Sequence, residues 1–513
     1  MDRNLWLAVA LSFGVYAVWV SFFEKPVAPR PAATAAATVP GVSAAPAASA
    51  PAAAAPAPAE APPPQFDAKG LLSRSDAAGL DGSEALVSPW GAGLDSFVYP
   101  GPHGEKIQLV ADPLHPLFTT WPGLLFRRDP SVKDGAAYEA VRSDGLRVEK
   151  EFLPGVGKVL PRIVVTVRNP TRRALDVGPW TLTVGPGLGT TAGEQKENKK
   201  LTRVIALTPK GGGLRGRVET LKPGAHDGPY RWVAVDNRYF LAALLPPEGT
   251  FGPALSAAPP ALTLTAEPVT LKAGQSAAWT IPYYLGPKGQ TGLAAYGVGL
   301  ERAIDFGFFA TIGRWMLEAL VRLHGLTGNW GWAIITLTLL LQIFLMPLTW
   351  KSLKAAASMR KLQPEITKLQ QRYKDDPTKL NTEMMALYKK GGANPLGGCL
   401  PMLMQMPIFV ALYNALRSSW ELHGAAWAFW IHDLSAKDPY YILPIVMGAL
   451  MFAQSKLNPP VADPTQQQMM MFMPIIFTVM FLNFPSGLVL YWLTNSLVST
   501  LLQLALKDRL QAA

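Results

Sequence analysis

The sequence predicts a membrane α-helical bundle, with one N-terminal span and a five-span core that includes a cytoplasmic helical hairpin, and with an inserted periplasmic antiparallel β-sandwich domain. Three observations predict this fold. Apolar runs are concentrated in the first 25 residues and after Leu326. Short alternating runs between Gly/Pro turns fill residues 65–300. A basic segment interrupts the C-terminal apolar runs, and at 513 residues the chain has room for several domains.

Residues 1–25 are expected to form an N-terminal transmembrane helix. Leu5 to Phe23 is a stretch of 19 residues without a charge, and it follows Arg3. A signal peptide is the alternative, but its apolar region is normally about 7–15 residues long and precedes a small-residue cleavage site. Here the run is longer and ends at Phe22-Phe23-Glu24, which favours an uncleaved span. Cleavage in the Ala-rich segment that follows stays open.

Residues 26–64 are expected to be an Ala/Pro-rich tether, because they hold 18 Ala and 11 Pro among 39 positions. Proline at this density prevents a helix, and few side chains are available to form a core. Such a segment provides reach between folded parts.

Residues 65–300 are expected to form the β-sandwich domain. Short apolar runs separated by turns such as Gly211-Gly-Gly213 predict antiparallel strands at Ile107–Ala111, Arg162–Arg168, Trp180–Val184, Arg203–Leu207, Tyr230–Val235 and Ala261–Ala266. Because membrane segments flank the domain, it lies wholly on one side. The first span begins in the cytoplasm, so that side is the periplasm.

Residues 301–325 are expected to form an amphipathic interfacial helix. Between residues 302 and 323, apolar residues recur at three- and four-residue steps among five charged ones, at Phe306, Phe309, Ile312, Trp315, Met316, Ala319 and Leu323. A helix that packs on the β domain is the alternative.

Residues 326–506 are expected to hold the five-span core. The predicted spans are Trp330–Thr349, Pro401–Leu416, Tyr440–Phe452, Met469–Phe484 and Leu488–Leu506. Several are short for a hydrocarbon layer that needs about 20 helical residues. With the N-terminal span they give six crossings and place both termini in the cytoplasm, where residues 507–513 form a short tail.

The segment 351–392 is expected to be a cytoplasmic helical hairpin. It carries ten Lys/Arg against four Asp/Glu between Lys351 and Lys390, and Asp375-Asp-Pro377 divides it. Basic charge between apolar runs is typical of a cytoplasmic loop rather than of a nucleic-acid site. The hairpin is either a solvated spacer or a docking surface for a nascent chain, a ribosome or a targeting factor. The candidate docking residues are Lys361, Lys368, Arg372 and Lys379.

The predicted core spans contain no Asp, Glu, Lys, Arg or His. Ion-coupled transporters normally bury such residues along their path, so this composition argues against active transport. No Walker-type loop for ATP is present, and one cysteine (Cys399) with six scattered histidines predicts no metal and no cofactor. The spans do contain neutral polar residues. These either bond between helices or line a wetted groove for the polar end of a client protein.

The C-terminal motifs resemble the YidC/Oxa family of membrane protein insertases, in its Gram-negative form. The motifs are Gly328-Asn-Trp-Gly331, Pro347-Leu-Thr349, Glu383-Met-Met-Ala-Leu-Tyr388, Asn394-Pro-Leu-Gly-Gly-Cys399, Gln405-Met-Pro-Ile-Phe409, Trp430-Ile-His-Asp-Leu434, Asp438-Pro-Tyr-Tyr-Ile-Leu-Pro444 and Phe484-Pro-Ser-Gly-Leu-Val-Leu-Tyr491. The N-terminal span, the tether and Tyr284-Leu-Gly-Pro-Lys288 match more loosely.

The resemblance implies a five-span core with a periplasmic β-supersandwich, located in the bacterial inner membrane. It also implies an insertase and folding chaperone, not an enzyme, that moves hydrophobic segments of client proteins into the membrane without nucleotide hydrolysis. The implied partners are nascent membrane proteins, the Sec translocon and membrane lipids, with the ribosome and the signal recognition pathway left open and no direct nucleic acid. The implied substrate groove is lined by Thr338, Gln342, Gln405 and Trp492.

One residue departs from the family pattern. Bacterial members typically carry an arginine in the groove on the first core span, and counting back from Pro347-Leu-Thr349 places Gln342 there. Glutamine can form hydrogen bonds but supplies no positive field. We therefore hypothesise that this groove depends on hydration and local bilayer thinning more than on acidic client tails.

Three other functions were weighed. A channel or solute transporter predicts inverted repeats or midplane charges, and the sequence shows neither. An enzyme with its site in the β domain needs convergent acid and base residues, which the sequence does not reveal. An assembly chaperone bound to the Sec translocon is compatible with the insertase hypothesis.

Overall fold

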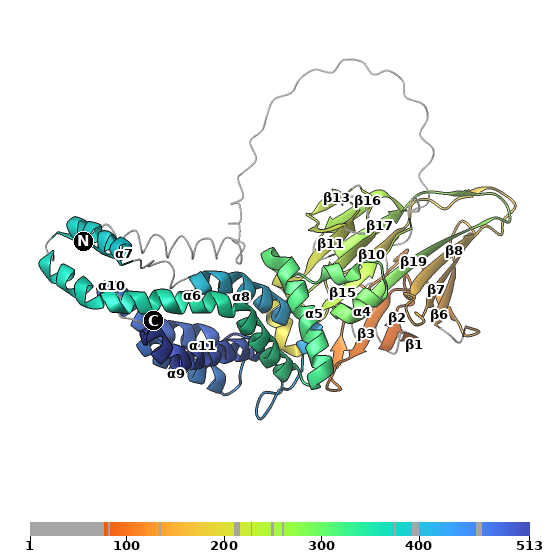
Figure 1. Cartoon of the computed structure of the whole chain (residues 1–513). Helices are drawn as coiled ribbons and strands as arrows, with labels where there is room; N and C mark the ends of the chain where they lie inside the picture. The colour runs from red at the N-terminus through yellow and green to blue at the C-terminus, as the bar shows by residue number, and fades with distance from the viewer. Residues whose placement is uncertain are drawn as a thin grey trace, which may run out of the picture. The chain divides into compact units, whose positions relative to one another are not determined.

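The computed structural model describes residues 76–80, 83–132, 135–209, 216–226, 228–247, 251–258, 261–373, 376–391, 400–457 and 464–512. The predicted N-terminal span and tether lie outside the described residues, as do the Gly211–Gly213 turn and Cys399. Figure 1 shows strands and helices gathered in separate regions of the chain.

All described strands pair antiparallel, and the largest sheet has nine strands. Its order is β12 (Arg217–Thr220), β11 (Arg203–Thr208), β14 (Trp232–Asp236), β15 (Phe240–Leu244), β19 (Ser276–Pro287), β8 (Arg162–Arg168), β7 (Arg147–Leu153), β6 (Ala136–Val141) and β5 (Arg127–Asp129). Two four-stranded sheets accompany it. One is β10 (Thr181–Val184), β17 (Ala261–Ala266), β16 (Phe251–Ala258) and β13 (Gly224–His226). The other is β1 (Asp76–Leu80), β2 (Ser83–Val87), β3 (Leu94–Pro100) and β4 (Lys106–Gln108), and β18 (Thr270–Leu271) pairs with β9 (Leu175–Asp176).

The predicted strands are confirmed, with shifts at their ends. Residues 162–168 and 261–266 match β8 and β17 without a shift. The first predicted strand is wrong at its C-terminal end, because β4 ends at Gln108. There the Gln108 side-chain oxygen accepts from the Val110 backbone N–H, at 3.0 Å, which takes that donor away from the ladder.

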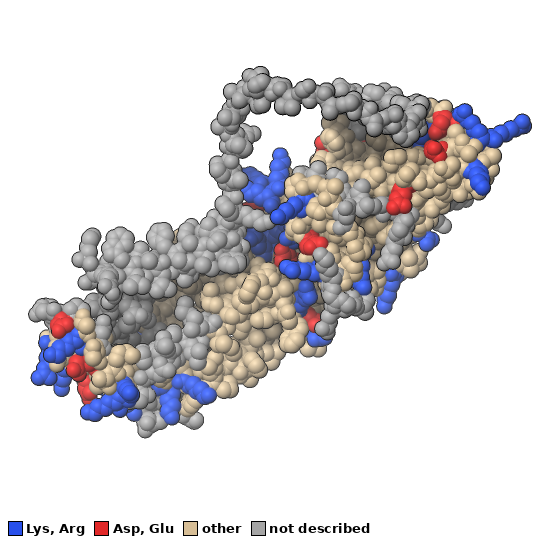
Figure 2. Space-filling view, turned by 90° about the horizontal axis from the view of Figure 1, so that it is seen from above, with Lys and Arg blue, Asp and Glu red and all other residues tan. Residues whose placement is uncertain are grey.

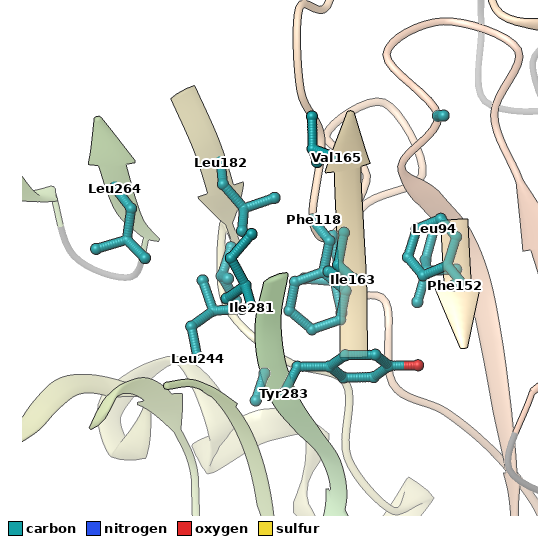
Figure 3. Close-up of a cluster of buried hydrophobic side chains, with 14 of the residues drawn as sticks. Leu94, Phe118, Phe152, Ile163, Val165, Leu182, Leu244, Leu264, Ile281 and Tyr283 are labelled. Atoms are coloured by element: carbon teal, nitrogen blue, oxygen red, sulfur yellow. The ribbon is translucent and has the colours of Figure 1, made fainter. Parts of the chain in front are cut away.

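The core of the sandwich forms where side chains of the nine-stranded sheet meet the β10–β17 sheet. Figure 3 shows Ile281 and Leu244 near Leu182 and Leu264, with Phe118 and Tyr283 beside them. Strands β14 and β15 are buried on both faces. Their alternate residues enter two cores, because Val233 and Val235 face the sandwich while Trp232 and Ala234 join a second cluster with α5 and the bundle.

Two short helices lie in the β domain, α3 (Gln195–Leu201) and α4 (Gln290–Ala295). The described helices that follow them belong to the bundle. They are α5 (Ala310–Thr327), α6 (Trp330–Arg372), α7 (Pro377–Lys390), α8 (Leu400–Ser418), α9 (Ile442–Leu457), α10 (Pro464–Phe481) and α11 (Ser486–Ala512). Single 3-10 turns are η1 (Ala192–Glu194), η2 (Leu300–Ala303), η3 (Gly307–Phe309) and η5 (Trp420–Leu422). Helix α11 lies centrally, since it contacts α6, α8 and α9.

The first predicted core span and the first arm of the hairpin are one helix. Helix α6 has 43 residues and continues through Lys351, so it is roughly 65 Å long at 1.5 Å per residue. This exceeds a hydrocarbon layer of about 30 Å, so the helix extends beyond that layer. The predicted span limit at Thr349 is not the end of a helix, because Lys and Arg are good helix formers that change polarity without breaking a helix.

The five predicted spans differ in length. Trp330–Met359 and Ser486–Ala505 are long and apolar enough to cross a membrane, whereas Ile442–Leu457 and Met471–Phe481 are shorter apolar helices. The helix of the third predicted span, α9, begins two residues later than expected, because Tyr441 directly before it has a φ of +58°. The fourth predicted span ends early, at Phe481, and α11 begins at Ser486, so four residues, 482–485, connect these two helices.

The predicted amphipathic helix also begins later than expected, at Ala310. Gly307 has a φ of +66° and its N–H bonds the Asp305 carboxylate, so the chain turns there before the helix starts. The face toward α6 and α8 carries Gly313, Met316, Leu317 and Leu320, while Trp315 on another face is 73% exposed. Trp315 was grouped with Met316 in one stripe, and the structure separates them.

Candidate functional site

A polar stripe runs along α11 at Tyr491, Asn495 and Ser499. The three residues are four positions apart, so they share one helix face. Gln342 on α6 contacts the second and third, and Gln405 on α8 contacts the first. The stripe therefore connects two of the residues that the family resemblance assigned to a groove. Tyr491, Asn495 and Ser499 were not among the predicted site residues, although their four-residue spacing is visible in the sequence.

Gln342 is bonded across the helix interface. Its side-chain amide donates to the Asn495 side-chain oxygen and, at 3.4 Å, to the Ser499 hydroxyl. Gln342 is only 9% exposed. A buried amide in an apolar bundle needs such partners, because a polar group without them is costly there. The position at which the family pattern has a cation is thus occupied by a neutral, hydrogen-bonded side chain.

Gln405 contacts the first residue of the stripe, and Trp492 directly follows that residue on α11. The Gln405 amide donates to the Tyr491 hydroxyl. The Trp492 ring stands edge-to-face with Phe409 of α8, with centroids 5.1 Å apart, and tilts against Phe481 of α10 at 5.5 Å. Trp492 is therefore part of an aromatic cluster, next to the polar stripe and not bonded within it.

Thr338 is buried one turn before Gln342, and its hydroxyl is used within its own helix. It donates to the Ile334 carbonyl at 2.7 Å. Thr478, Thr494 and Thr500 bond the carbonyl four residues earlier in the same way. This arrangement satisfies a hydroxyl inside a helix without a partner helix.

The four candidate docking cations are exposed on the α6–α7 hairpin. Lys361, Lys368 and Arg372 belong to the last turns of α6, and Lys379 to the first turn of α7. The Lys379 ammonium lies 5.4 Å from the Tyr373 ring centroid. In Figure 2, Lys and Arg side chains gather at the end of the molecule that α7 occupies, and an uncharged band follows. The hairpin offers a positively charged surface to solvent.

The bundle helices carry many exposed apolar side chains. Phe344 is 79% exposed and Ile343 65%. The exposed set is Trp332, Leu339, Leu340, Ile343, Phe344, Met346 and Trp350 on α6, Ile445, Val446 and Phe452 on α9, Met471, Phe472, Ile475, Ile476, Val479 and Met480 on α10, and Leu497, Leu501 and Leu504 on α11. A surface of this extent is typical of contact with lipid.

The end of the bundle where α6 begins is held together by hydrogen bonds to the α8–α9 loop (residues 419–441). The Asn329 side chain caps α6 by accepting from the Gly331 and Trp332 N–H groups, and it donates to the Trp427 carbonyl at 3.0 Å. The buried Asp438 carboxylate accepts from the Leu443 N–H at 2.7 Å and caps α9. The Ser486 hydroxyl donates to the Asp433 carbonyl, so α11 is tied to the same loop.

The same loop contacts the β domain through a segment that the sequence did not indicate. The Trp420 ring lies 5.1 Å from Phe240 and 6.1 Å from Tyr99, and it stacks on His423. The Arg238 guanidinium donates to the Arg417 carbonyl at 2.9 Å, near the end of α8. The contacts place this loop and the β domain on the same side of the bundle.

A buried charge cluster lies where the β domain leads into α5. Asp236 accepts from Arg203 at 3.0 Å and from the Lys288 ammonium at 2.9 Å, and Arg203 also bonds Asp305 at 2.8 Å. Burial lowers the pKa of Lys288, and the Asp236 carboxylate partly offsets this effect. The same carboxylate raises the pKa of Arg203. The cluster joins β11, β14 and the residue that follows β19 to the chain before α5.

Among the described residues, no group of three or more His, Cys, Asp or Glu side chains is arranged to hold a metal ion. The geometry that the described residues do show is polar contacts between helices and a charged hairpin.

Comparison with known proteins connects both parts of the chain to one family. Residues 322–513 match the model of the 60Kd inner membrane protein family, and residues 138–319 match the YidC periplasmic domain. The chain is 34% identical to the membrane protein insertase YidC of Endomicrobium trichonymphae over 98% of this chain and 97% of that protein. It is 35% identical to the one of Polynucleobacter asymbioticus over 73% of this chain and 71% of that protein.

Among solved structures, a crystal structure of active YidC insertase with its first transmembrane domain resolved covers 84% of this chain and 92% of its own, at 19% identity. Its TM-score of 0.39 is too low for the superposition to support a conclusion. The sequence matches are sufficient by themselves, since one relative aligns over nearly the whole length of both chains. The chain belongs to the YidC family of membrane protein insertases, which are inner-membrane proteins with a periplasmic domain.

Proposed function

We propose that the protein is an insertase and folding chaperone that moves hydrophobic segments of client proteins from the cytoplasm into the inner membrane. It acts alone or with the Sec translocon, and it requires no nucleotide hydrolysis. The polar stripe Tyr491–Asn495–Ser499, with Gln342 and Gln405 on it, carries this proposal. It is a line of hydrogen-bonding groups inside a bundle whose outer faces are apolar.

The stripe can lower the cost of moving a client's hydrophilic end. A peptide group in hydrocarbon lacks hydrogen-bond partners and pays a large desolvation penalty. The amides of Gln342 and Asn495 are each both donor and acceptor, so they can exchange their mutual bond for bonds to a peptide group or to water. The amides that now bond each other in the stripe are therefore the groups that would form hydrogen bonds to a client.

The direction of movement follows from the two ends of the bundle. The end of the bundle where α6 begins is connected to the α8–α9 loop through hydrogen bonds of Asn329, Asp438 and Ser486. The opposite end carries the basic α6–α7 hairpin, which we assign to the cytoplasm together with both termini. Clients then enter from the hairpin side and leave sideways into lipid. Helix α5, with Trp315 exposed, lies at the periplasmic membrane surface in this arrangement.

Photo-crosslinking to a stalled nascent membrane protein tests the groove. A crosslinker at Gln342, Gln405 or Trp492 is expected to capture the client. The matched control is Phe344 on the same helix as Gln342, which is 79% exposed on the apolar surface. We expect the client at the first three positions and mainly lipid at Phe344. Only lipid and self-contacts at all four positions would contradict the proposal.

The substitution Gln342→Arg tests what the missing cation means. We expect the variant to favour clients with acidic tails, because a buried guanidinium attracts them through a medium of low dielectric constant. Wild type is expected to insert acidic and neutral tails with similar efficiency. An identical charge preference in both proteins would refute the hydration hypothesis and leave the insertase proposal intact.

The hairpin is proposed to dock a nascent chain, a ribosome or a targeting factor through Lys361, Lys368, Arg372 and Lys379. Replacing all four with Gln removes the charge and keeps good helix formers. Association with ribosomes or stalled chains is expected to fall, most strongly at low salt. If co-sedimentation and insertion do not change, the hairpin is a spacer.

A further inference from the structure

The α8–α9 loop exposes an aromatic side chain in an unusual backbone conformation. Phe429 is 85% exposed and has a φ of +55°. The left-handed region is unfavourable for a bulky residue, and an exposed phenyl ring is unfavourable in water. The one described ring contact of Phe429 is a stack on its neighbour Trp430, with centroids 5.9 Å apart. Within the described chain, few contacts compensate for the strained backbone and the exposed ring of Phe429.

The turn that carries Phe429 is firmly built. The Trp427 N–H donates to the Ile431 carbonyl at 3.0 Å, and the Ile431 N–H donates to the Ala428 carbonyl at 3.1 Å. Asn329 donates to the Trp427 carbonyl. A Cβ at Gly331 would lie 2.0 Å from the Trp427 ring, so this glycine is what allows the ring to pack against α6. The surrounding contacts therefore fix the outward direction of Phe429, which is expected when strain serves a purpose.

The turn is continuous with the apolar surface of the bundle. The Trp427 ring stands edge-to-face with Trp332, with centroids 6.1 Å apart, and Trp332 is 51% exposed at the start of α6. The exposed apolar side chains of α6 follow from there. Trp420 of the same loop contacts Phe240 of the β domain, which the family assignment makes periplasmic. The Phe429 turn is thus at the periplasmic end of the lipid-facing surface.

We propose that Phe429 and its turn, residues 427–431, insert into the boundary between headgroups and acyl chains of the periplasmic leaflet. Aromatic residues favour this zone, where an apolar ring meets a polar backbone. A lipid fits better than a protein partner, because a specific interface buries about 800 Å² on each side. The turn presents one fully exposed ring between two half-buried tryptophans. The proposal does not depend on the groove.

The insertion has a consequence for bilayer thickness. Helix α9 follows the turn and has 16 residues, so it is roughly 24 Å long. The hydrocarbon layer is about 30 Å thick. An anchor near the periplasmic start of so short a helix holds the leaflet boundary at that level, so the bilayer is thinned beside α9.

Spin labelling of single cysteines tests the insertion, because the chain has one cysteine, Cys399. The full chain with Cys399→Ser and Phe429→Cys is labelled with a nitroxide and placed in vesicles of phosphatidylethanolamine and phosphatidylglycerol. Collision rates with oxygen, which dissolves in lipid, and with a nickel chelate, which stays in water, then give the depth. Phe344→Cys is the lipid control, and Val156→Cys, 76% exposed in the β domain, is the control for an exposed apolar site in water.

We expect oxygen to exceed the nickel chelate at Phe429→Cys, with a ratio between those of the two controls. Ala428→Cys leaves Phe429 in place, and there too the collision rate with oxygen is expected to exceed the rate with the nickel chelate. This variant controls for disturbance of the turn by Phe429→Cys itself. A ratio equal to that of Val156→Cys at both positions would place the turn in water and overturn the proposal. Low rates for both reagents would show a protein contact and would overturn it as well.

Discussion

The β domain and the helical bundle bury polar groups in different ways. The β domain buries full charges, since Lys288 and Asp236 are almost completely enclosed and bond each other at 2.9 Å. In the described part of the bundle, the polar side chains that bond between α6, α8 and α11 are amides and hydroxyls, as at Gln342, Asn495 and Tyr491. One region pairs ions and the other pairs neutral groups.

The difference follows from the solvent in which each region works. A charge in a water-exposed domain can be buried when a partner of opposite sign and further hydrogen bonds replace its hydration. In a lipid-facing bundle a charge costs more, and a neutral amide keeps its bonds exchangeable. The bundle therefore remains polar inside without fixing a strong field, which is compatible with the proposed contact with clients of many sequences.

The largest expected effect comes from breaking the ion cluster. Asp236→Asn keeps the shape but leaves Lys288 and Arg203 without their shared anion, so we expect a loss of about 3–5 kcal/mol in the unfolding free energy of the β domain. Thermal or denaturant unfolding of the purified full chain measures it. The control is Glu84→Gln, because its pair with Lys106 is largely exposed on both sides. The loss in unfolding free energy caused by Glu84→Gln should stay within about 1 kcal/mol.

If Asp236→Asn costs no more than Glu84→Gln, the cluster is not a stabilising feature, and the contrast between charged and neutral burial loses its energetic meaning.

A smaller effect concerns Lys150, which is fully buried and donates to the Gly91 carbonyl at 3.2 Å and to the Phe118 carbonyl. Burial lowers the pKa of Lys150 well below its ordinary value. Between the folded pKa and the unfolded value of about 10.4, the unfolded chain binds more protons, so stability rises with pH by at most about 1.4 kcal/mol per unit.

In the variant Lys150→Met this rise should disappear. The unfolding midpoint of both proteins, followed from pH 7 to pH 10, measures the difference in slope. Parallel curves would mean that Lys150 keeps its charge in the folded domain.

The smallest expected effect is the coupling between Gln342 and Asn495. In a double-mutant cycle with Gln342→Leu and Asn495→Leu, we expect an interaction energy that averages about 0.6 kcal/mol for such membrane contacts and reaches at most about 1.7 kcal/mol. Unfolding in mixed micelles provides the four stabilities. Thr338→Val is the matched control on the same helix, because its hydroxyl bonds its own helix.

The control cycle of Thr338→Val with Asn495→Leu should give a coupling near zero. A coupling as large as that of Gln342 would indicate that any buried polar change on α6 disturbs α11, and that the Gln342 contact has no special role.

Local patterns predicted much of the fold. The alternating run at Arg162–Arg168 gave β8 its limits, and the Asp375-Asp-Pro377 break separates α6 from α7. Helix ends were predicted less well. The limit at Thr349 failed because polarity changes there while helix propensity does not, and the start of α5 depended on Gly307 adopting a positive φ.

The contacts among the candidate groove residues could not be predicted from the sequence. Gln342 and Gln405 were assigned to one groove, but the resemblance to a family supplied them, and nothing in the sequence states that both meet α11. Trp420 gave no signal, because an aromatic residue after an apolar helix can face lipid, water or another domain. Its position against Phe240 and Tyr99 depends on contacts with distant parts of the chain.

The sequence by itself determined which segments are apolar, which are charged and which repeat at strand or helix spacing, because these properties belong to neighbouring residues. The tertiary structure alone decided which polar groups meet. Gln342 and Asn495 are separated by 153 positions, so no local pattern in the sequence could pair them. Their contact exists because α6 and α11 pack side by side, which is a property of the whole bundle.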